Sequence, residues 1–301
     1  LMRSSAASDV YKRQDFTQLL ELCDHIVFNS FGQWKKYRQQ VQDATRNISC
    51  GIRINPGYAE VETDLYNPCI SGSRMGVPLE QMEDDDFAGL DGIHFHTMCE
   101  QNSDVLERTL DHMLPQFDKW LKRCKWVNFG GGHHITRPDY DVERLVRCIE
   151  RVRDTYGVQV YLEPGEAVAL NAGYLVATVL DVVHNGMNIA ILDASAACHM
   201  PDVLEMPYRP HILYSGTAGE KAYTYRLAGN TCLAGDVIGD YSFDHQLQAG
   251  EKLVFCDMAI YSMVKNNTFN GVPLPDIALY QNGKIQLVKR FGYADFEGRL
   301  S

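Results

Sequence analysis

The chain lacks the features that mark membrane, secreted and nucleic-acid-binding proteins. No apolar run approaches the roughly 20 residues of a membrane span, and no charged-then-apolar amino terminus indicates a signal peptide. Basic stripes are also missing: 28 Lys and Arg stand against 39 Asp and Glu, for a formal net charge of −11. We therefore expect no nucleic-acid partner and no membrane partner, with the cytoplasm as compartment. The acidic balance weakly favours a cationic substrate.

Cysteine and histidine spacing argues against a metal site or a disulfide framework. The nine cysteines are scattered and include no Cys-x-x-Cys pair, so most are expected to be small buried apolar residues. His133 and His134 are adjacent, so their side chains diverge, and no Glu-x-x-His partner follows them. We expect no metal.

The chain has 301 residues, of which 45% are hydrophobic, and its two parts differ in their pattern of strand-like and helix-like segments. The first two thirds alternate between strand-like and helix-like segments, which is typical of βα units around a parallel sheet; from about Tyr208 the segments are short and β-rich. The predicted fold is α/β: a TIM-type (β/α)8 barrel, incomplete at its amino end, followed by a mainly β carboxyl-terminal domain. The predicted boundaries are 1–14 for a non-native segment, 15–207 for the partial barrel and 208–301 for the β domain.

Hydrophobic periodicity predicts the individual elements. The expected barrel strands are His25–Asn29, Ser49–Asn55, Gly92–His96, Lys125–Phe129, Val158–Glu163 and Met187–Asp193. The expected helices are Phe31–Gln42, Val105–Leu121 and Val142–Tyr156. The expected strands of the second domain are Ala222–Leu227, Lys252–Asp257, Ile277–Tyr280 and Lys284–Val288.

Two short motifs follow strand-like runs, where barrel and α/β folds place their chemistry. The first is the turn Asn128–Gly132, in which Gly130, Gly131 and Gly132 offer unhindered N–H groups that suit a phosphate. A glycine turn alone is more often a tight connection without a ligand. The second motif begins with Glu163, and a carboxylate at this strand end can hold the protonated ring nitrogen of pyridoxal phosphate. Together the motifs predict a site for both ends of that cofactor.

These two motifs belong to a longer series along the chain. Its members are Gly51–Gly57, His94-Phe95-His96, Asn128–Gly132, Glu163–Glu166, Gly229–Cys232 with Asp236, and Tyr261 with Phe269-Asn270-Gly271. In order and spacing this series resembles the alanine-racemase-like (fold type III) pyridoxal-phosphate decarboxylases. Leu192–Ser195, Cys198–Glu205 and His96–Glu100 resemble the carboxynorspermidine decarboxylase branch of that family. The resemblance covers the chain from about Asp15 to its end.

The resemblance implies pyridoxal-phosphate-dependent removal of the α-carboxylate of carboxynorspermidine or carboxyspermidine, giving norspermidine or spermidine. It implies that His96 stacks on the pyridine ring, the glycine turn binds the phosphate and Glu163 pairs with the ring nitrogen. Arg53 would lie beside the cofactor, and the Tyr261 hydroxyl would reach the phosphate. For a lone His or Tyr the alternative is packing; only the ordered set favours these roles.

The resemblance also implies a homodimer with shared active sites. The loop of Cys232 would enter the site of the partner subunit, where the thiol reprotonates the α-carbon and Asp236 helps to position the substrate. A lone cysteine is more often a small buried residue. Because the substrate amines are cationic, acids are needed at the far end of the pocket. The candidates, of which one or two are expected to bind, are Asp193, Asp202, Glu205 and Asp236.

Two positions depart from the wider decarboxylase pattern. Met98-Cys99 stands where relatives have Gly-Ser, and Glu166 stands where many have arginine. An anion cannot bind phosphate as arginine does, so the remaining phosphate donors are open.

A Schiff-base lysine is expected in the family at the end of the first barrel strand, but none of the eleven lysines has such a context. We expect an amino-terminally truncated, inactive chain, whose opening Leu1–Gln14 resembles foreign sequence. Two alternatives stay open: diaminopimelate or another basic amino-acid decarboxylase, and a non-catalytic dimerisation or regulatory module without the lysine.

Overall fold

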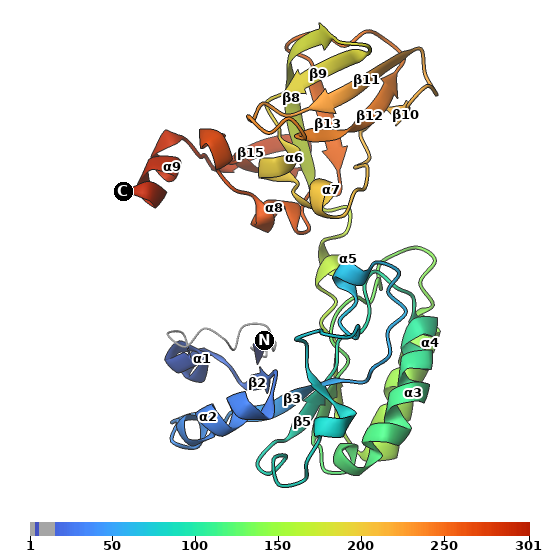
Figure 1. Cartoon of the computed structure of the whole chain (residues 1–301), viewed down its shortest axis with the longest axis vertical. Helices are drawn as coiled ribbons and strands as arrows, with labels where there is room; N and C mark the ends of the chain where they lie inside the picture. Colours follow the sequence, from blue (N-terminus) through green and yellow to red (C-terminus); the bar gives the residue numbers. More distant parts are fainter. Residues whose placement is uncertain (1–3, 6–15) are drawn as a thin grey trace. The chain divides into compact units, whose positions relative to one another are not determined.

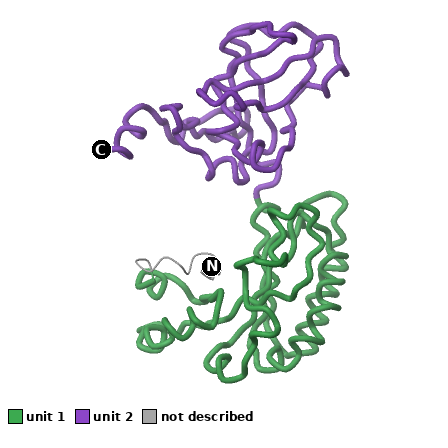
Figure 2. Tube along the Cα trace, viewed as in Figure 1, with its two compact units in different colours: residues 1–168 green, residues 169–301 purple. Residues whose placement is uncertain are grey.

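The computed structural model of the chain describes residues 4–5 and 16–301. It contains two compact units, Leu1–Val168 and Ala169–Ser301, which Figure 2 colours separately. The predicted non-native segment, residues 1–14, lies outside the described residues apart from Ser4 and Ser5.

A parallel sheet forms the frame of the first unit (Figure 1). Its strand order is β1-β2-β3-β5-β6-β7, and the short strand β4 pairs with the end of β3. The strands are β1 (Ser4–Ser5), β2 (His25–Phe28), β3 (Ser49–Asn55), β4 (Val77–Pro78), β5 (Gly92–His94), β6 (Trp126–Asn128) and β7 (Gln159–Tyr161). The predicted barrel strands before residue 170 are therefore confirmed, with shorter carboxyl ends for most.

Helices connect these strands. They are α1 (Phe16–Leu22), α2 (Phe31–Gln42), α3 (Ser103–Leu121), α4 (Val142–Tyr156) and α5 (Gly165–Ala169), with 3-10 turns at Asp64–Tyr66 and Leu79–Gln81. Local caps explain why α2 and α4 have their predicted bounds. The Ser30 hydroxyl accepts a 3.2 Å hydrogen bond from the Gln33 amide at the start of α2. Gly157, with a φ of 66°, ends α4 in the left-handed conformation.

Alternate residues of each strand face opposite sides of this sheet. Ile52, Ile93 and Val127 are fully buried on one side, in the apolar core to which α3 and α4 also contribute. Arg53 and His94, one residue further along their strands, face the other side. The sheet therefore separates an apolar core from a face that carries polar side chains.

Trp126 fills part of this second face. Gly51 of β3 lies opposite Gly92 of β5, which lies opposite Trp126 of β6. A Cβ added at either glycine would overlap the Trp126 ring. The indole Nε1 donates a 2.8 Å hydrogen bond to the Ser49 hydroxyl. The two strand glycines are thus required by the close approach of an aromatic ring.

A mixed sheet forms the second unit, with strand order β10-β12-β11-β9-β8-β13. Its strands are β8 (Tyr174–His184), β9 (Asn188–Leu192), β10 (Gly216–Thr217), β11 (Tyr223–Ala228), β12 (Val237–Phe243) and β13 (Lys252–Cys256). β14 (Ile277–Gln281) and β15 (Lys284–Lys289) form a separate hairpin. The short helices are α6 (Ala196–His199), α7 (Asp202–Glu205), α8 (Ser262–Lys265) and α9 (Tyr293–Leu300), with a 3-10 turn at Phe269–Gly271.

The boundary between the units lies at Val168 and Ala169, earlier than the predicted boundary at 207 and 208. The expected barrel strand Met187–Asp193 is β9, which pairs antiparallel with β8 and parallel with β11 in the second sheet. The long strand β8 was not predicted. An apolar run indicates a strand but not the sheet that it joins, so the sequence pattern could not place β9. The two-part fold class is confirmed, with more of the chain in the β part.

Gly92→Ala is expected to lower the free energy of unfolding of the first unit by about 1–3 kcal/mol, because the methyl group overlaps a rigid indole. All three tryptophans, Trp34, Trp120 and Trp126, lie in that unit, so their fluorescence during urea unfolding reports on it. The control Gly32→Ala, inside α2 without a close neighbour, should be neutral or stabilising by up to about 1 kcal/mol. Unchanged stability of the Gly92 variant would contradict the close approach.

Candidate active site

Strand register brings several polar side chains into one row. Arg53 of β3 lies opposite His94 of β5, His94 opposite Asn128 of β6, and Asn128 opposite Tyr161 of β7. The row lies at the carboxyl ends of the strands, on the face away from the apolar core. Two residues beyond Tyr161, the Glu163 amide donates a 2.8 Å hydrogen bond to the Gly130 carbonyl. The two predicted motifs are therefore neighbours in space.

Glu163 is held as a carboxylate at the end of this row. The Asn128 side-chain amide donates a 2.9 Å hydrogen bond to Glu163 Oε1, and His94 Nε2 lies 3.5 Å from Oε2. Partial burial acts to raise the pKa of Glu163, but the interactions with His94 and Asn128 outweigh it and lower that pKa. The carboxylate stays about one-third exposed, so it can also meet a ligand.

His94 lies beside Glu163, although it was not among the predicted site residues. It is almost completely buried, and burial lowers the pKa of its imidazole, so the ring is neutral. Its ring nitrogens make no conventional hydrogen bond within the described protein, and Glu163 Oε2 is the carboxylate that Nε2 approaches. The signal available in the sequence was its spacing of two from His96, which suggested only a shared face.

His96 follows β5 and is half-buried. Its Nδ1 accepts a 2.8 Å hydrogen bond from the Gly131 amide. Burial, and then the nearby charge of Arg53, lower the pKa of His96 to about 4. The ring is therefore neutral at physiological pH, which is compatible with the predicted stacking role.

Arg53 contacts the backbone of His96. Its side chain is buried, and Nη2 donates a long hydrogen bond, 3.4 Å, to the His96 carbonyl. Nη1 lies 3.4 Å from the Met75 sulfur. The role of Arg53 beside a ligand stays a prediction.

The amides of the glycine turn are divided among different partners. The Gly130 amide donates to Asn128 Oδ1 at 2.8 Å, and the Gly131 amide donates to His96. Gly132 donates to no acceptor in the described part of the chain. A Cβ at Gly132, where φ is 84°, would overlap the Met98 carbonyl. Phosphate binding at Gly130–Gly132 stays a prediction, and of the three amides only that of Gly132 lacks an acceptor among the described residues.

In the second unit, a buried carboxylate anchors the predicted cysteine loop. Asp236 accepts 2.7 Å hydrogen bonds from the hydroxyls of Ser195 and Thr231 and a 3.2 Å bond from the Ala197 amide. Because Asp236 is nearly inaccessible, its carboxylate serves the loop and not a substrate in this structure. Cys232 itself is exposed, and its amide donates to Asn270 Oδ1 at 2.9 Å.

Two of the other predicted substrate acids already hold a cation. Lys265 forms ion pairs with Asp202 and, at 3.2 Å, with Glu205. The hydrogen bond to Asp202 raises the pKa of Lys265, so its amine is held protonated and unsuited to act as a nucleophile. No lysine lies in a described strand of the first unit, so among the described residues none takes the expected strand-end position.

The remaining predicted residues of this unit are exposed. Asp193 Oδ1 accepts a 2.6 Å hydrogen bond from the Thr178 amide, next to the pairing of β8 with β9. Tyr261 is 56% exposed and precedes α8, with Lys265 5.8 Å from its ring centre. Both residues thus lie at the surface of the unit.

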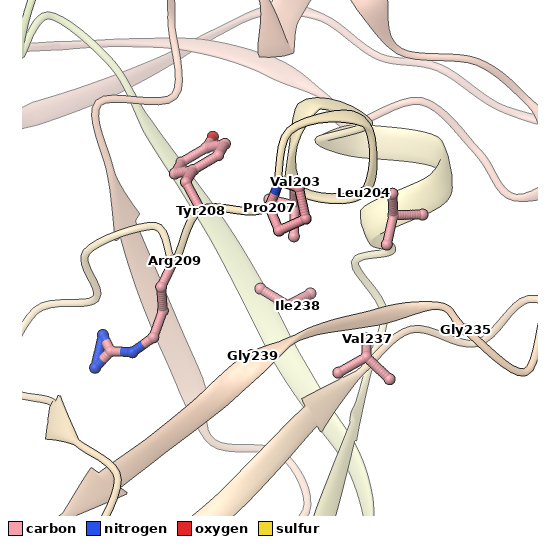
Figure 3. A pocket seen from close by; sticks show the side chains of 9 residues that line it. All are labelled: Val203, Leu204, Pro207, Tyr208, Arg209, Gly235, Val237, Ile238 and Gly239. Atoms are coloured by element: carbon pink, nitrogen blue, oxygen red, sulfur yellow. The ribbon is translucent and has the colours of Figure 1, made fainter. Parts of the chain in front are cut away.

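The second unit also contains a hollow (Figure 3). The Arg209 guanidinium at its rim is already engaged, because it donates to the Gly216 and Asp240 carbonyls and lies 4.0 Å from the Tyr241 ring centre. None of the predicted site residues lines it. The lining residues are Val203, Leu204, Pro207, Tyr208, Arg209, Gly235, Val237, Ile238 and Gly239.

Residues 4–5 and 16–301 contain no group of three or more His, Cys, Asp or Glu side chains that could hold a metal ion. In the same residues, every helix is too short or too polar to cross a membrane.

Comparison with known proteins identifies the family. The model of the pyridoxal-dependent decarboxylases, described as their C-terminal sheet domain, matches residues 10–259. The chain is 43% identical to a carboxynorspermidine/carboxyspermidine decarboxylase of Campylobacter jejuni, over 97% of this chain and 78% of that protein. The chain belongs to the pyridoxal-dependent decarboxylase family.

Other members of the pyridoxal-dependent decarboxylase family agree in sequence and fold. A carboxyaminopropylagmatine decarboxylase of Synechocystis is 41% identical over 96% of this chain and 75% of that protein. The crystal structure of the Campylobacter jejuni carboxynorspermidine decarboxylase with norspermidine matches with a TM-score of 0.86 and 41% identity, covering 96% of this chain and 78% of that one. A diaminopimelate decarboxylase structure, 21% identical, shares the fold with a TM-score of 0.80. The predicted resemblance and cofactor are confirmed.

The residues of the first unit fit pyridoxal 5'-phosphate. An ionised carboxylate at Glu163 suits a protonated pyridine nitrogen, and the neutral imidazole of His96 suits the face of the ring. The amide of Gly132, which donates to no acceptor among the described residues, suits a phosphate oxygen.

The first unit should lose stability in mild acid. Burial lowers the pKa values of His25, His94, His96 and His133, so below about pH 6.5 the unfolded chain binds more protons than the folded one. The free energy of unfolding should therefore fall as pH drops from 6.5 towards 4, by up to about 1.4 kcal/mol per pH unit for each histidine.

Urea unfolding followed by tryptophan fluorescence at several pH values measures this slope. His94→Gln should reduce the slope, because one buried neutral imidazole is removed. His112→Gln, at an exposed position of the same unit, is the control and should change the slope less than His94→Gln does. Equal slopes in wild type and the His94 variant would show that the buried ring does not carry the effect.

Proposed function

We propose that the chain carries the cofactor and substrate sites of a pyridoxal-phosphate-dependent decarboxylase of carboxynorspermidine or carboxyspermidine, whose products are norspermidine or spermidine. The observation that carries the chemistry is the ionised Glu163 beside the neutral His96 at the carboxyl ends of the parallel strands. The substrate class is supported by the relatives, since two carboxynorspermidine/carboxyspermidine decarboxylases are 43% and 33% identical over nearly the whole chain.

The protein residues bind and orient the cofactor, which when bound supplies an electron sink for the bond to the departing carboxylate. Glu163 would keep a proton on the ring nitrogen, and His96 would lie against the ring. The Gly132 amide would bind the phosphate, and the contact of the Tyr261 hydroxyl with the phosphate stays a prediction of the resemblance. Arg53 holds the His96 backbone in place through its contact with the carbonyl.

Cys232 returns a proton to the α-carbon after carbon dioxide has left. Its exposed thiol and the rigid anchoring of its loop by buried Asp236 support this role, because a proton donor has to reach the reacting atom from a fixed position. We place the thiol in the active site of the partner subunit of a homodimer. The active unit is then the dimer, with shared sites.

The distal amines of the substrate are bound by Asp202 and Glu205. This pair already holds the ammonium group of Lys265, which supports its capacity for a cation. A solved relative of similar fold contains norspermidine, a product with the same kind of amines. Of the four acids predicted from sequence, Asp236 is committed to its loop and Asp193 to the β8 backbone.

Of two other possible substrates, one has specific support. The relative from Synechocystis acts on carboxyaminopropylagmatine, which ends in a guanidinium group and would need the same acids. Diaminopimelate decarboxylases match less of the sequence, for example 30% identity over 54% of the chain. Diaminopimelate carries a distal carboxylate, which an acid pair repels.

Product binding to the chain loaded with pyridoxal 5'-phosphate tests this proposal. By calorimetry, norspermidine and spermidine should bind at least tenfold more tightly than lysine, the product from diaminopimelate, because lysine keeps its carboxylate. Combined Asp202→Asn and Glu205→Gln substitutions should weaken polyamine binding about tenfold or more. Asp244→Asn, which breaks the exposed ion pair with Lys221, is the matched control and should change nothing.

Tighter binding of lysine than of the polyamines would reject the proposed substrate class. Aminopropylagmatine binding more tightly than both polyamines would favour the substrate of the Synechocystis relative. Carbon dioxide release from carboxynorspermidine is the second readout. Turnover by this chain would refute the expectation of inactivity and support the substrate.

A further inference from the structure

The hydrogen bond between the Gly131 amide and His96 determines where the histidine carries its proton. A peptide N–H can only donate, so Nδ1, at 2.8 Å, has to be the bare nitrogen of the ring. The proton of the neutral imidazole then lies on Nε2. Protonation of Nδ1 would turn this contact into two opposed donors.

The surroundings of His96 act in the same direction. Arg53 on β3 places a positive charge nearby, and the neutral rings of His94 and His133 contribute no anion. Glu163 is the acid that favours the charged ring, but burial and Arg53 outweigh it, so the pKa of His96 falls to about 4. The electrostatics therefore keep the ring neutral, and the hydrogen bond from the Gly131 amide selects its Nε2–H tautomer.

The Gly130 amide determines the orientation of the Asn128 side chain. Because the Gly130 amide donates to Asn128 Oδ1 at 2.8 Å, the oxygen of the Asn128 side chain faces the turn. The opposite end, Nδ2, has to face Glu163 Oε1, which it approaches at 2.9 Å. A flipped side chain would put an oxygen against the carboxylate and an NH2 against the amide.

We propose that the turn Gly130–Gly132 is a positioning element for the ring of the cofactor, in which the Gly131 amide fixes His96 as the Nε2–H tautomer and the Gly130 amide fixes Asn128 as a donor to Glu163. This inference rests on the proposed contacts of His96 and Glu163 with the ring. Each amide then has a separate role, because Gly130 serves the carboxylate, Gly131 the stacking ring and Gly132 the phosphate. The turn is then more than a phosphate loop.

Nitrogen NMR of the cofactor-free chain tests the tautomer directly. In 15N-histidine-labelled protein, two-bond 1H–15N correlation spectra distinguish a protonated ring nitrogen from a bare one. The His96 signals are those absent from the spectrum of His96→Asn. We expect a protonated Nε2, a bare Nδ1 and no titration of His96 between pH 5 and pH 8. A proton on Nδ1, or a titration midpoint near 6.5, would overturn the proposal.

A pair of variants isolates the amide. Gly131→Ala and Gly131→Pro both add a Cβ, 2.7 Å from the Glu163 carbonyl at its ideal position, but only proline removes the N–H. The alanine variant should keep the Nε2–H tautomer. The proline variant should show mixed tautomers and a midpoint at least one pH unit higher. Identical spectra of the two would reject the role of the amide. If both fail to fold, the measurement on the wild type decides.

The test of the His96 tautomer can fail or succeed independently of the test of the proposed function. The spectra are recorded without cofactor, so the tautomer can be confirmed while polyamine binding fails, or the reverse. Pyridoxal 5'-phosphate is then added to the wild type and to Gly131→Ala. A merely structural turn would leave the Nε2 proton signal of His96 unchanged on binding, whereas a ring that contacts the cofactor should shift it.

Discussion

The register of the parallel strands is the constraint on which the site depends. Side chains alternate between the two faces of a strand, so equal register across β3, β5 and β6 brings Arg53, His94 and Asn128 into one row. A slip of one residue in any strand would send its polar side chain into the apolar core and a core residue into the site. The apolar residues on the helix side therefore secure the position of the polar ones.

The electrostatics of the row follow from its burial. Histidines in a poorly solvated place are neutral, whereas Glu163 stays ionised because Asn128 donates to it and His94 lies close by. One anion among neutral rings is an arrangement that suits a protonated heterocycle. The backbone amides of the glycine turn keep this arrangement, since they can donate in only one sense.

In the second unit, carboxylates have two different kinds of partner. Asp236 is buried and accepts hydrogen bonds that hold the loop of Cys232, whose thiol is exposed. Asp202 and Glu205 are less buried and hold the ammonium group of Lys265. An acid that anchors a loop and an acid that pairs with a lysine look alike in a sequence.

By itself, the sequence determined the βα pattern, the bounds of α2 and α4, the glycine turn, Glu163 and, through the ordered motifs, the family. These are local properties: periodicity, caps and spacing act within a few residues. Only the tertiary structure decided that β9 joins the second sheet, that His94 approaches Glu163, that two of the three glycine amides are already used, and that Lys265 occupies the acid pair. Each depends on which segments meet in space, and hydrogen bonds between distant residues leave no periodicity in the chain.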